Sequence, residues 1–294
     1  MLDVTDLDKT YGEGERATHA IEGLSFTVEE TEFVCVVGPS GCGKTTLLKC
    51  MSGLMAATSG QVALRGRPVR RPPEEMAFVF QEYSRSLMPW MSVRDNVLLP
   101  LRHKKMTKAE RVRHVEEAVD SVALTPFIDR YPWELSGGMQ QRVAIARALA
   151  YQPEILLMDE PFASVDAQTR ADLEDLILRV RKQYGVTIVF VTHDIDESVY
   201  LGDRIIVLTP PPTHVQEILT VDIPGARDQV ETKELPQFAR LRAHVFRAIK
   251  RKQQPAEAHA DAPPSADHVG PLHAELRAAR VSVSRRACTR PGRR

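Results

Sequence analysis

The segment Gly38-Pro39-Ser40-Gly41-Cys42-Gly43-Lys44-Thr45 follows the apolar run Phe33–Val37 and precedes a predicted helix over residues 44 to 52. A strand, a glycine-rich loop and a helix in this order predict a phosphate-binding loop, because backbone N–H groups and the helix start favour an anion. A chance glycine-rich turn is the alternative, and the flanking elements argue against it. We expect ATP to contact the following residues of this loop: Gly38, Pro39, Ser40, Gly41, Cys42, Gly43, Lys44, Thr45 and Thr46.

Two acids further along the chain suit the same chemistry. The apolar run over residues 155 to 158 predicts a buried strand, and Asp159 and Glu160 follow it directly. Acids at the carboxyl edge of a parallel sheet face a nucleotide bound there. We therefore expect Asp159 and the hydroxyl of Thr45 to hold Mg²⁺, and Glu160 to polarise the attacking water as general base, with Lys44 on the β- and γ-phosphates. The alternative is a pair of solvated acids.

A second segment with open backbone N–H groups lies between these motifs. It reads Leu135-Ser136-Gly137-Gly138-Met139-Gln140-Gln141-Arg142, and Ser136 is a favourable N-cap for the helix that follows. This sequence resembles the signature motif of the ABC ATPases. In that family two subunits dimerise head to tail, and each signature helix caps the γ-phosphate bound by the other subunit. The resemblance thus implies nucleotide contacts from Ser136, Gly137, Gly138 and Gln140.

The resemblance covers about residues 1 to 250 and implies roles for four more positions. Gln81 resembles the glutamine that senses Mg²⁺ and the attacking water, and His193 resembles the switch histidine that contacts the γ-phosphate. Residues 163 to 166 resemble the D-loop that ends in Asp166, although Val165 replaces the common leucine. Tyr11 resembles the aromatic residue that stacks on adenine, with an exposed hairpin tyrosine as the open alternative.

The resemblance also predicts the fold and the domain organisation. We expect an α/β protein: a P-loop ABC ATPase core with a mostly parallel sheet, an N-terminal antiparallel β subdomain and an inserted helical subdomain over about 82 to 138. The ATPase domain should cover residues 1–252. Residues 253–294 are rich in Ala, Pro and Arg, which predicts a disordered tail.

The element Leu-x-Pro-Trp-x-x-Val-x-x-Asn, from Leu87 to Asn96, resembles ATPases of the nitrate, sulfonate and taurine importer group. It implies an ATP-hydrolysing subunit that energises uptake of a small anionic or polar solute. The partners implied are a second copy of the chain, an integral membrane permease and, indirectly, a solute-binding protein, at the cytoplasmic face of the inner membrane. Trp90 either docks the permease or packs inside the helical subdomain.

The charge balance and the length of the apolar runs bear on the alternative functions. Lys plus Arg and Asp plus Glu both number 39, so a zero net charge does not favour nucleic acid as a partner. The longest apolar runs are strand-sized, so transport requires a separate permease. The rivals are an exporter ATPase, a nucleic-acid or ribosome-associated cassette, and an inactive scaffold. The intact Lys44, Asp159, Glu160 and His193 argue against the last.

The four cysteines, Cys35, Cys42, Cys50 and Cys288, form no metal-binding pattern and are expected as free thiols. Cys42 lies inside the phosphate loop. Because a helix N-terminus lowers the pKa of a thiol, the sequence predicts a reactive Cys42 whose modification blocks ATP binding.

Overall fold

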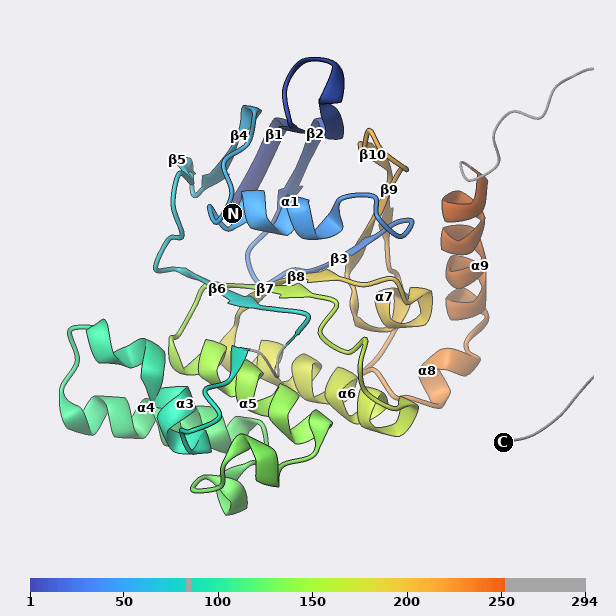
Figure 1. Cartoon of the computed structure of the whole chain (residues 1–294). Coiled ribbons are helices and arrows are strands. Elements are labelled where there is room, and N and C mark those ends of the chain that lie inside the picture. The colour runs from blue at the N-terminus through green and yellow to red at the C-terminus, as the bar shows by residue number, and fades with distance from the viewer. Residues whose placement is uncertain (83–85, 252–294) are drawn as a thin grey trace, which may run out of the picture. The chain divides into compact units, whose positions relative to one another are not determined.

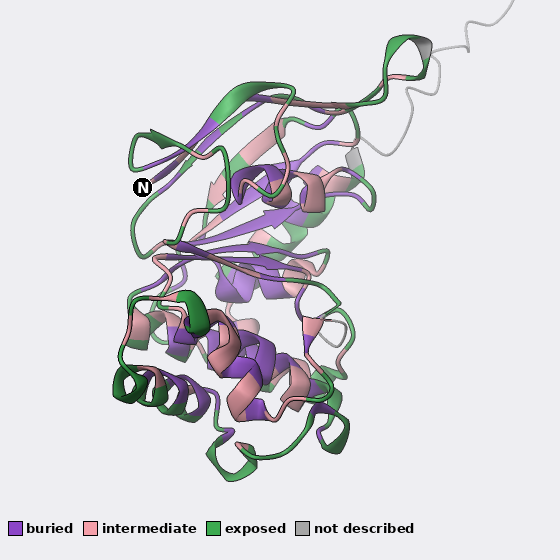
Figure 2. Cartoon of the chain, turned by 60° about the vertical axis from the view of Figure 1, so that its left-hand side comes forward, coloured by how far each residue is buried: buried purple, intermediate pink, exposed green. Residues whose placement is uncertain are grey.

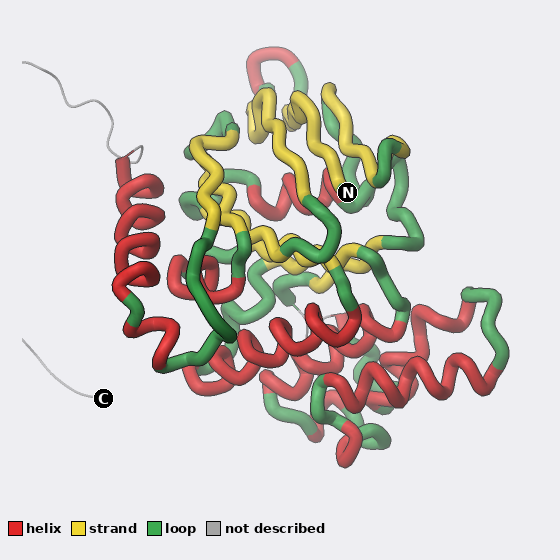
Figure 3. Tube along the Cα trace, turned by 180° about the vertical axis from the view of Figure 1, so that it is seen from behind, coloured by secondary structure: helices red, strands yellow, loops and turns green. Residues whose placement is uncertain are grey.

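A computed structural model describes residues 1–82 and 86–251 of the 294-residue chain. The predicted tail, 253–294, lies outside the described residues. Two sheets dominate the described part (Figures 1 and 3). The first sheet has the order β2-β1-β4-β5, with all pairs antiparallel. Its strands are β1 (Leu2–Tyr11), β2 (Thr18–Val28), β4 (Ser59–Leu64) and β5 (Arg67–Pro68). This confirms the expected antiparallel N-terminal part.

The second sheet has the order β10-β9-β3-β8-β7-β6, and only β10 runs antiparallel to its neighbour. It therefore confirms the mostly parallel core. Its strands are β3 (Phe33–Val37), β6 (Met76–Val79), β7 (Ile155–Asp159), β8 (Thr187–Val191), β9 (Arg204–Leu208) and β10 (Val215–Thr220). The carboxyl ends of the parallel strands share one edge.

The parallel sheet is buried on both faces, as its continuous apolar strands predict (Figure 2). Alternate residues of β3 point to opposite faces: Phe33 and Cys35 pack toward the helices, and Val34 and Val36 pack toward the antiparallel sheet. Between the two sheets lies α1 (Lys44–Met51). The central sheet thus separates two cores, and both fix the position of its carboxyl edge.

Helices cover the other face of the parallel sheet (Figure 1). Further along the chain lie the helices α3 (Val93–Leu98), α4 (Lys108–Ser121), α5 (Gly137–Ala150), α6 (Ala167–Tyr184), α7 (Ile195–Leu201), α8 (Glu231–Glu234) and α9 (Pro236–Arg251). Short 3-10 helices span Gly14–Arg16, Leu99–His103, Thr125–Phe127 and Pro132–Glu134. A capping box begins α4, because Thr107 and Glu110 exchange hydrogen bonds there. The bounds 82–138 and 1–252 stay predictions.

Within the described residues, no helix is long and apolar enough to cross a membrane. The last described helix is α9. Its residues Phe238 and Val245 are buried, whereas Phe246 is half-exposed. Trp90 is 69% exposed, so the alternative in which it packs inside the helical part is wrong.

Candidate functional site

The phosphate loop connects the end of β3 to the start of α1, as the sequence predicts. Gly43 adopts a φ of 94°, which a residue with a side chain would strain to reach. Lys44 is buried, and its Nζ donates to the carbonyl oxygens of Gly38 (3.1 Å) and Pro39 (3.3 Å). The loop therefore holds a cationic side chain against its own concave backbone, directly beside the N-terminus of α1.

Three more predicted residues meet this loop at the carboxyl edge of the sheet. Gln81 follows β6, Glu160 follows β7 and His193 follows β8, and these strands are neighbours. The Oε2 atom of Glu160 accepts from Gln81 Nε2 at 3.2 Å and lies 3.2 Å from His193 Nδ1. Its Oε1 atom lies 3.7 Å from Lys44 Nζ. The strand order thus brings together the four residues predicted to be catalytic.

Glu160 has an unusual backbone. Its φ is 41°, in the left-handed region where residues other than glycine are rare. Its N–H donates to the carbonyl of Val191 in β8 at 2.9 Å, which ties the turn to the neighbouring strand. Such a conformation persists only where the surroundings hold it, and strained residues gather at functional sites.

Asp159, the last residue of β7, is buried beside the phosphate loop. Thr45 Oγ1 donates to its Oδ1 at 3.1 Å. Burial raises the pKa of Asp159, and the charge of Glu160 adds to this, while the Thr45 hydrogen bond opposes it. A buried carboxylate next to a hydroxyl favours a bound cation, and these hard oxygen atoms fit Mg²⁺.

Tyr11, at the end of β1, contacts α1. Its hydroxyl lies 3.1 Å from Thr46 Oγ1 and 3.2 Å from Met55 Sδ, and the Lys9 ammonium lies 5.3 Å from the ring centre. The ring is 40% exposed. The structure thus places Tyr11 beside the phosphate-loop helix, as stacking on a bound adenine requires, and its role stays a prediction.

The signature segment, residues 135 to 142, lies at the start of α5. Ser136 Oγ accepts from the N–H of Met139 at 3.3 Å, so Ser136 is the N-cap. Gly138 has no room for a side chain, because a Cβ there would lie 2.3 Å from Thr169 Cγ2 on α6. The Gln140 amide donates to the carbonyls of Pro132 and Leu135, at 3.0 and 3.2 Å.

The second group of predicted residues stays apart from the first. Asp166 caps α6 through the N–H and hydroxyl of Thr169 (3.0 and 2.7 Å), and these hydrogen bonds lower the pKa of Asp166. Among the described residues, no hydrogen bond or ion pair joins residues 136 to 140 or Asp166 to Lys44 or Glu160. The predicted site residues thus fall into two groups that share no hydrogen bond or ion pair within the described part of the chain, and we refer to these groups as two surfaces.

The prediction of a reactive Cys42 is wrong. Its side chain is fully buried, and this burial raises the pKa of the thiol. The charge of Lys44 and backbone N–H groups act in the opposite direction and do not outweigh burial. Cys35, Cys42 and Cys50 are free and buried, as expected for free thiols, and Cys288 lies outside the described residues. Only the tertiary packing around the loop reveals this outcome.

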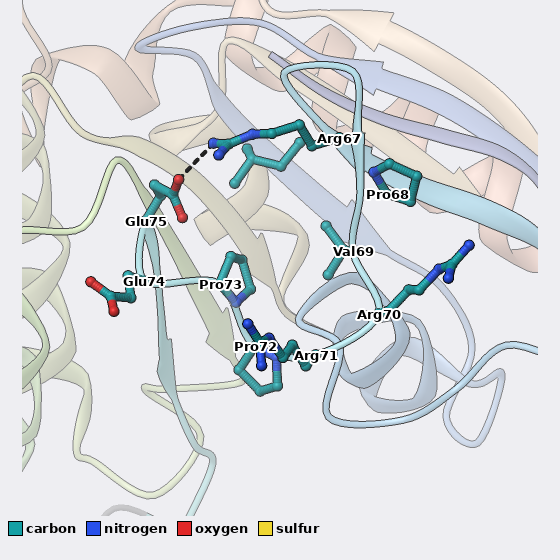
Figure 4. Close-up of a pocket in the computed structure, with 10 residues that line it drawn as sticks. Arg67, Pro68, Val69, Arg70, Arg71, Pro72, Pro73, Glu74 and Glu75 are labelled. Atoms are coloured by element: carbon teal, nitrogen blue, oxygen red, sulfur yellow. Dashed lines mark hydrogen bonds and ion pairs between the residues drawn. The ribbon is translucent and has the colours of Figure 1, made fainter.

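A cavity of about 760 Å³ lies away from both surfaces. It is lined by Leu64 and residues 67 to 75, between β4 and β6, and Figure 4 shows Arg67 reaching Glu75 across it. Their Nη2 and Oε1 atoms lie 2.6 Å apart. None of the predicted site residues lines this cavity, so the residues predicted to hold the nucleotide lie elsewhere, at the edge of the sheet.

Three side chains that the sequence analysis did not single out lie beside His193. They are Arg170 on α6, and Asp194 and Glu197 at the start of α7. Arg170 contacts both acids. No motif marked them, because an arginine and two acids at helix starts are common on any surface.

Comparisons with known proteins identify the family of this chain. The ABC transporter family model matches residues 21–163. The chain is 42% identical over 243 residues to the aliphatic sulfonates import ATP-binding protein SsuB of Bacillus licheniformis, covering 83% of this chain and 92% of that protein. It is also 42% identical over 239 residues to the nitrate import ATP-binding protein NrtC of Synechococcus elongatus, covering 80% of this chain and 36% of that longer protein.

The fold has solved counterparts as well. The dimeric structure of a post-hydrolysis state of the ATP-binding cassette MJ0796, bound to ADP and Pi, matches with a TM-score of 0.66 and 33% identity. The match covers 77% of this chain and 100% of that one. By its motifs, its relatives and its fold, this chain belongs to the ABC transporter ATP-binding proteins, the family of ATP-hydrolysing cassettes.

Proposed function

We propose that this chain is the ATP-hydrolysing subunit of an ABC importer, and that it energises uptake of a small anionic or polar solute through a separate permease. The observation that carries the proposal is the convergence of Lys44, Gln81, Glu160 and His193 at one edge of the sheet. The likeness to sulfonate and nitrate import proteins supports the direction of transport and the solute class.

Binding of the nucleotide rests on the phosphate loop. Backbone N–H groups over residues 38 to 46 and the N-terminus of α1 favour the β- and γ-phosphates, and Lys44 adds a full positive charge. Thr45 and Asp159 would hold Mg²⁺, with Gln81 beside them, and the ion would neutralise charge that develops on the phosphates. Tyr11 would stack on the adenine ring.

Hydrolysis rests on Glu160. Its carboxylate would accept a proton from the attacking water, and His193 and Gln81 lie close enough to hold it and the γ-phosphate in geometry. The Glu160 side chain contacts residues that follow both neighbouring strands, Gln81 after β6 and His193 after β8. Most of the rate would come from the placement of charges around the phosphates.

A dimer would unite the two separate surfaces. The second surface, made by Ser136, Gly137, Gly138, Gln140 and Asp166, would face the phosphate loop of a second copy arranged head to tail. The dimeric state of MJ0796 supports an assembly of two cassettes. Two bound ATP molecules would close this dimer, and their hydrolysis would reopen it.

The remaining partners follow from the importer role. The chain would sit at the cytoplasmic face of the inner membrane, attached through permease subunits that receive the solute from a binding protein. Trp90 is 69% exposed beside the start of α3, and a large exposed aromatic side chain suits a protein-docking surface. We propose that Trp90 contacts the permease.

A capture experiment tests this function. The full chain, with a C-terminal tag, is expressed in its native host, gently solubilised membranes are applied to resin, and copurifying proteins are identified. We expect a multi-spanning permease, whose companion binding protein can then be screened with nitrate, sulfonates and taurine. Recovery of ribosomes or nucleic acid without a permease would contradict the importer role.

The chain offers a matched pair of variants for this experiment. Trp90→Ala should reduce permease recovery, whereas Trp133→Ala should not, although Trp133 is similarly exposed at 65%. Equal recovery with both variants would show that Trp90 is not the docking residue, and would leave the importer role standing.

A further inference from the structure

The short segment that carries His193 is held from both sides. Thr192 precedes His193 and is buried, and its Oγ1 atom donates to Glu197 Oε2 at 2.5 Å. Asp194 follows His193, and its N–H donates to Thr192 Oγ1 at 2.9 Å. Asp194 also caps α7 by accepting from the N–H groups of Asp196 and Glu197, at 2.8 and 3.2 Å. The imidazole itself is 60% exposed, so its position depends on these neighbours.

One arginine from another helix joins both ends of this arrangement. Arg170 Nη1 donates to Asp194 Oδ2 at 2.9 Å, and its Nε lies 3.6 Å from Glu197 Oε1. That Nε atom is buried and makes no hydrogen bond, so the ion pair with Glu197 compensates for its loss of contact with solvent. The side chains of Arg170 and Asp194 are each 30% exposed, and that of Glu197 only 5%. A partly buried arginine between two acids is costly to remove, because it leaves buried negative charge unpaired.

The position of Arg170 in the chain connects these contacts to the D-loop. It lies in the first turn of α6, one residue after Thr169, whose N–H and hydroxyl bind Asp166 at the end of the D-loop. The ion pair between Arg170 and Asp194, the N-cap of α7, brings the first turn of α6 close to the start of α7. The start of α6 thus carries two residues with different neighbours: Asp166 belongs to the proposed dimer surface, and Arg170 contacts the segment that holds His193.

We infer that Arg170 is a positioning residue, which fixes His193 toward Glu160 and links the D-loop end of α6 to the catalytic edge. The inference rests on the proposed ATPase role of His193. Arg170 acts on His193 through other residues: it contacts Asp194 and Glu197, and Glu197 in turn accepts a hydrogen bond from Thr192. A shift of α6 on dimer closure would therefore move the His193 segment with it.

Steady-state ATP hydrolysis by the full chain tests this role. Arg170→Met should lower kcat by roughly 10- to 100-fold while KM for ATP changes little, because misplacing a catalytic group by about 1 Å has effects of this order. Arg170→Lys should recover part of the loss, since it keeps a cation near Asp194. Thermal unfolding of each variant shows whether the chain remains folded.

The matched control is Arg181→Met. Arg181 lies on the same helix, with 25% of its side chain exposed, and pairs with Asp203 at 2.5 and 3.1 Å, away from His193. It should lose stability as Arg170→Met does, with kcat close to that of the wild type. An equal loss of kcat in both variants would overturn the inference, because it would indicate a general structural effect.

A double-mutant cycle separates positioning from structure. In the His193→Ala background, Arg170→Met should lower kcat by no more than about 2-fold, since the residue it positions is gone. Losses that multiply would overturn the inference.

A readout without turnover is the imidazole proton resonance of His193, assigned by its absence in His193→Ala. It should shift in Arg170→Met and stay in place in Arg181→Met; an unchanged resonance in Arg170→Met would also overturn the inference. A wild-type chain that hydrolyses no ATP would instead contradict the proposed function.

Discussion

Glu197 offers a direct test of the electrostatics beside the catalytic edge. The residue lies in α7 and is 4% exposed. Burial, as the largest cause, raises its pKa from 4.5 to about 7. The hydrogen bond from Thr192 and the charge of Arg170 oppose this rise, and the negative charges of Asp194 and Glu174 add to it. Burial therefore outweighs the favourable contacts of the charged form.

The sign of the effect on stability follows from proton binding. Between pH 4.5 and about 7 the folded chain holds the Glu197 proton more often than the unfolded chain does. The free energy of unfolding therefore falls as pH rises through this window. The favourable contribution of Glu197 to the free energy of unfolding is complete below pH 4.5 and lost above about pH 7. Its full size is about 3 kcal/mol.

The variant Glu197→Gln removes the titration and keeps the shape. An amide can still accept the Thr192 hydrogen bond, and it carries no charge to bury. We expect the variant to match the wild type well below pH 4.5 and to exceed it by about 3 kcal/mol near pH 8. Urea unfolding followed by far-ultraviolet circular dichroism measures the difference at each pH.

The control is Glu22→Gln, because Glu22 is exposed on β2. This control measures the change in the free energy of unfolding that comes from losing a solvent-exposed carboxyl group. If the difference between wild type and Glu197→Gln is constant across this pH range, the pKa of Glu197 is not raised and the reasoning is refuted. A variant less stable than the wild type near pH 8 would show that the ion pair with Arg170 outweighs burial.

Three further predictions concern the nucleotide site. Glu160→Gln should lower kcat by roughly 10²- to 10⁴-fold and retain an ATP-bound dimer on size-exclusion chromatography, and near-normal phosphate release would exclude the general-base role. Tyr11→Ala should weaken ATP binding by about 1–3 kcal/mol in calorimetry with the Glu160→Gln chain, with Tyr131→Ala as control; an unchanged affinity would leave Tyr11 only as a partner of Thr46. Cys42 is buried and the pKa of its thiol is raised, so a maleimide should label it far more slowly in the native chain than in urea, as measured by mass spectrometry. Rapid labelling of the native chain would contradict this.

The sequence alone determined the features that depend on contiguous residues. The phosphate loop, with Gly43 and Lys44 at the start of α1, follows from a strand, glycines and a helix in direct succession. The buried strand before Asp159 and the N-cap Ser136 are equally local. The family resemblance supplied Gln81 and His193, which residue types alone could not have marked.

Only the tertiary structure decided which of these residues meet. Glu160 contacts Gln81 and His193 because β6, β7 and β8 are adjacent, and strand order is a property of the whole chain. Burial reversed the expected effect of the helix N-terminus on Cys42, since desolvation depends on packing from distant segments. Arg170 likewise gained its role from the approach of α6 to α7, which no local pattern encodes.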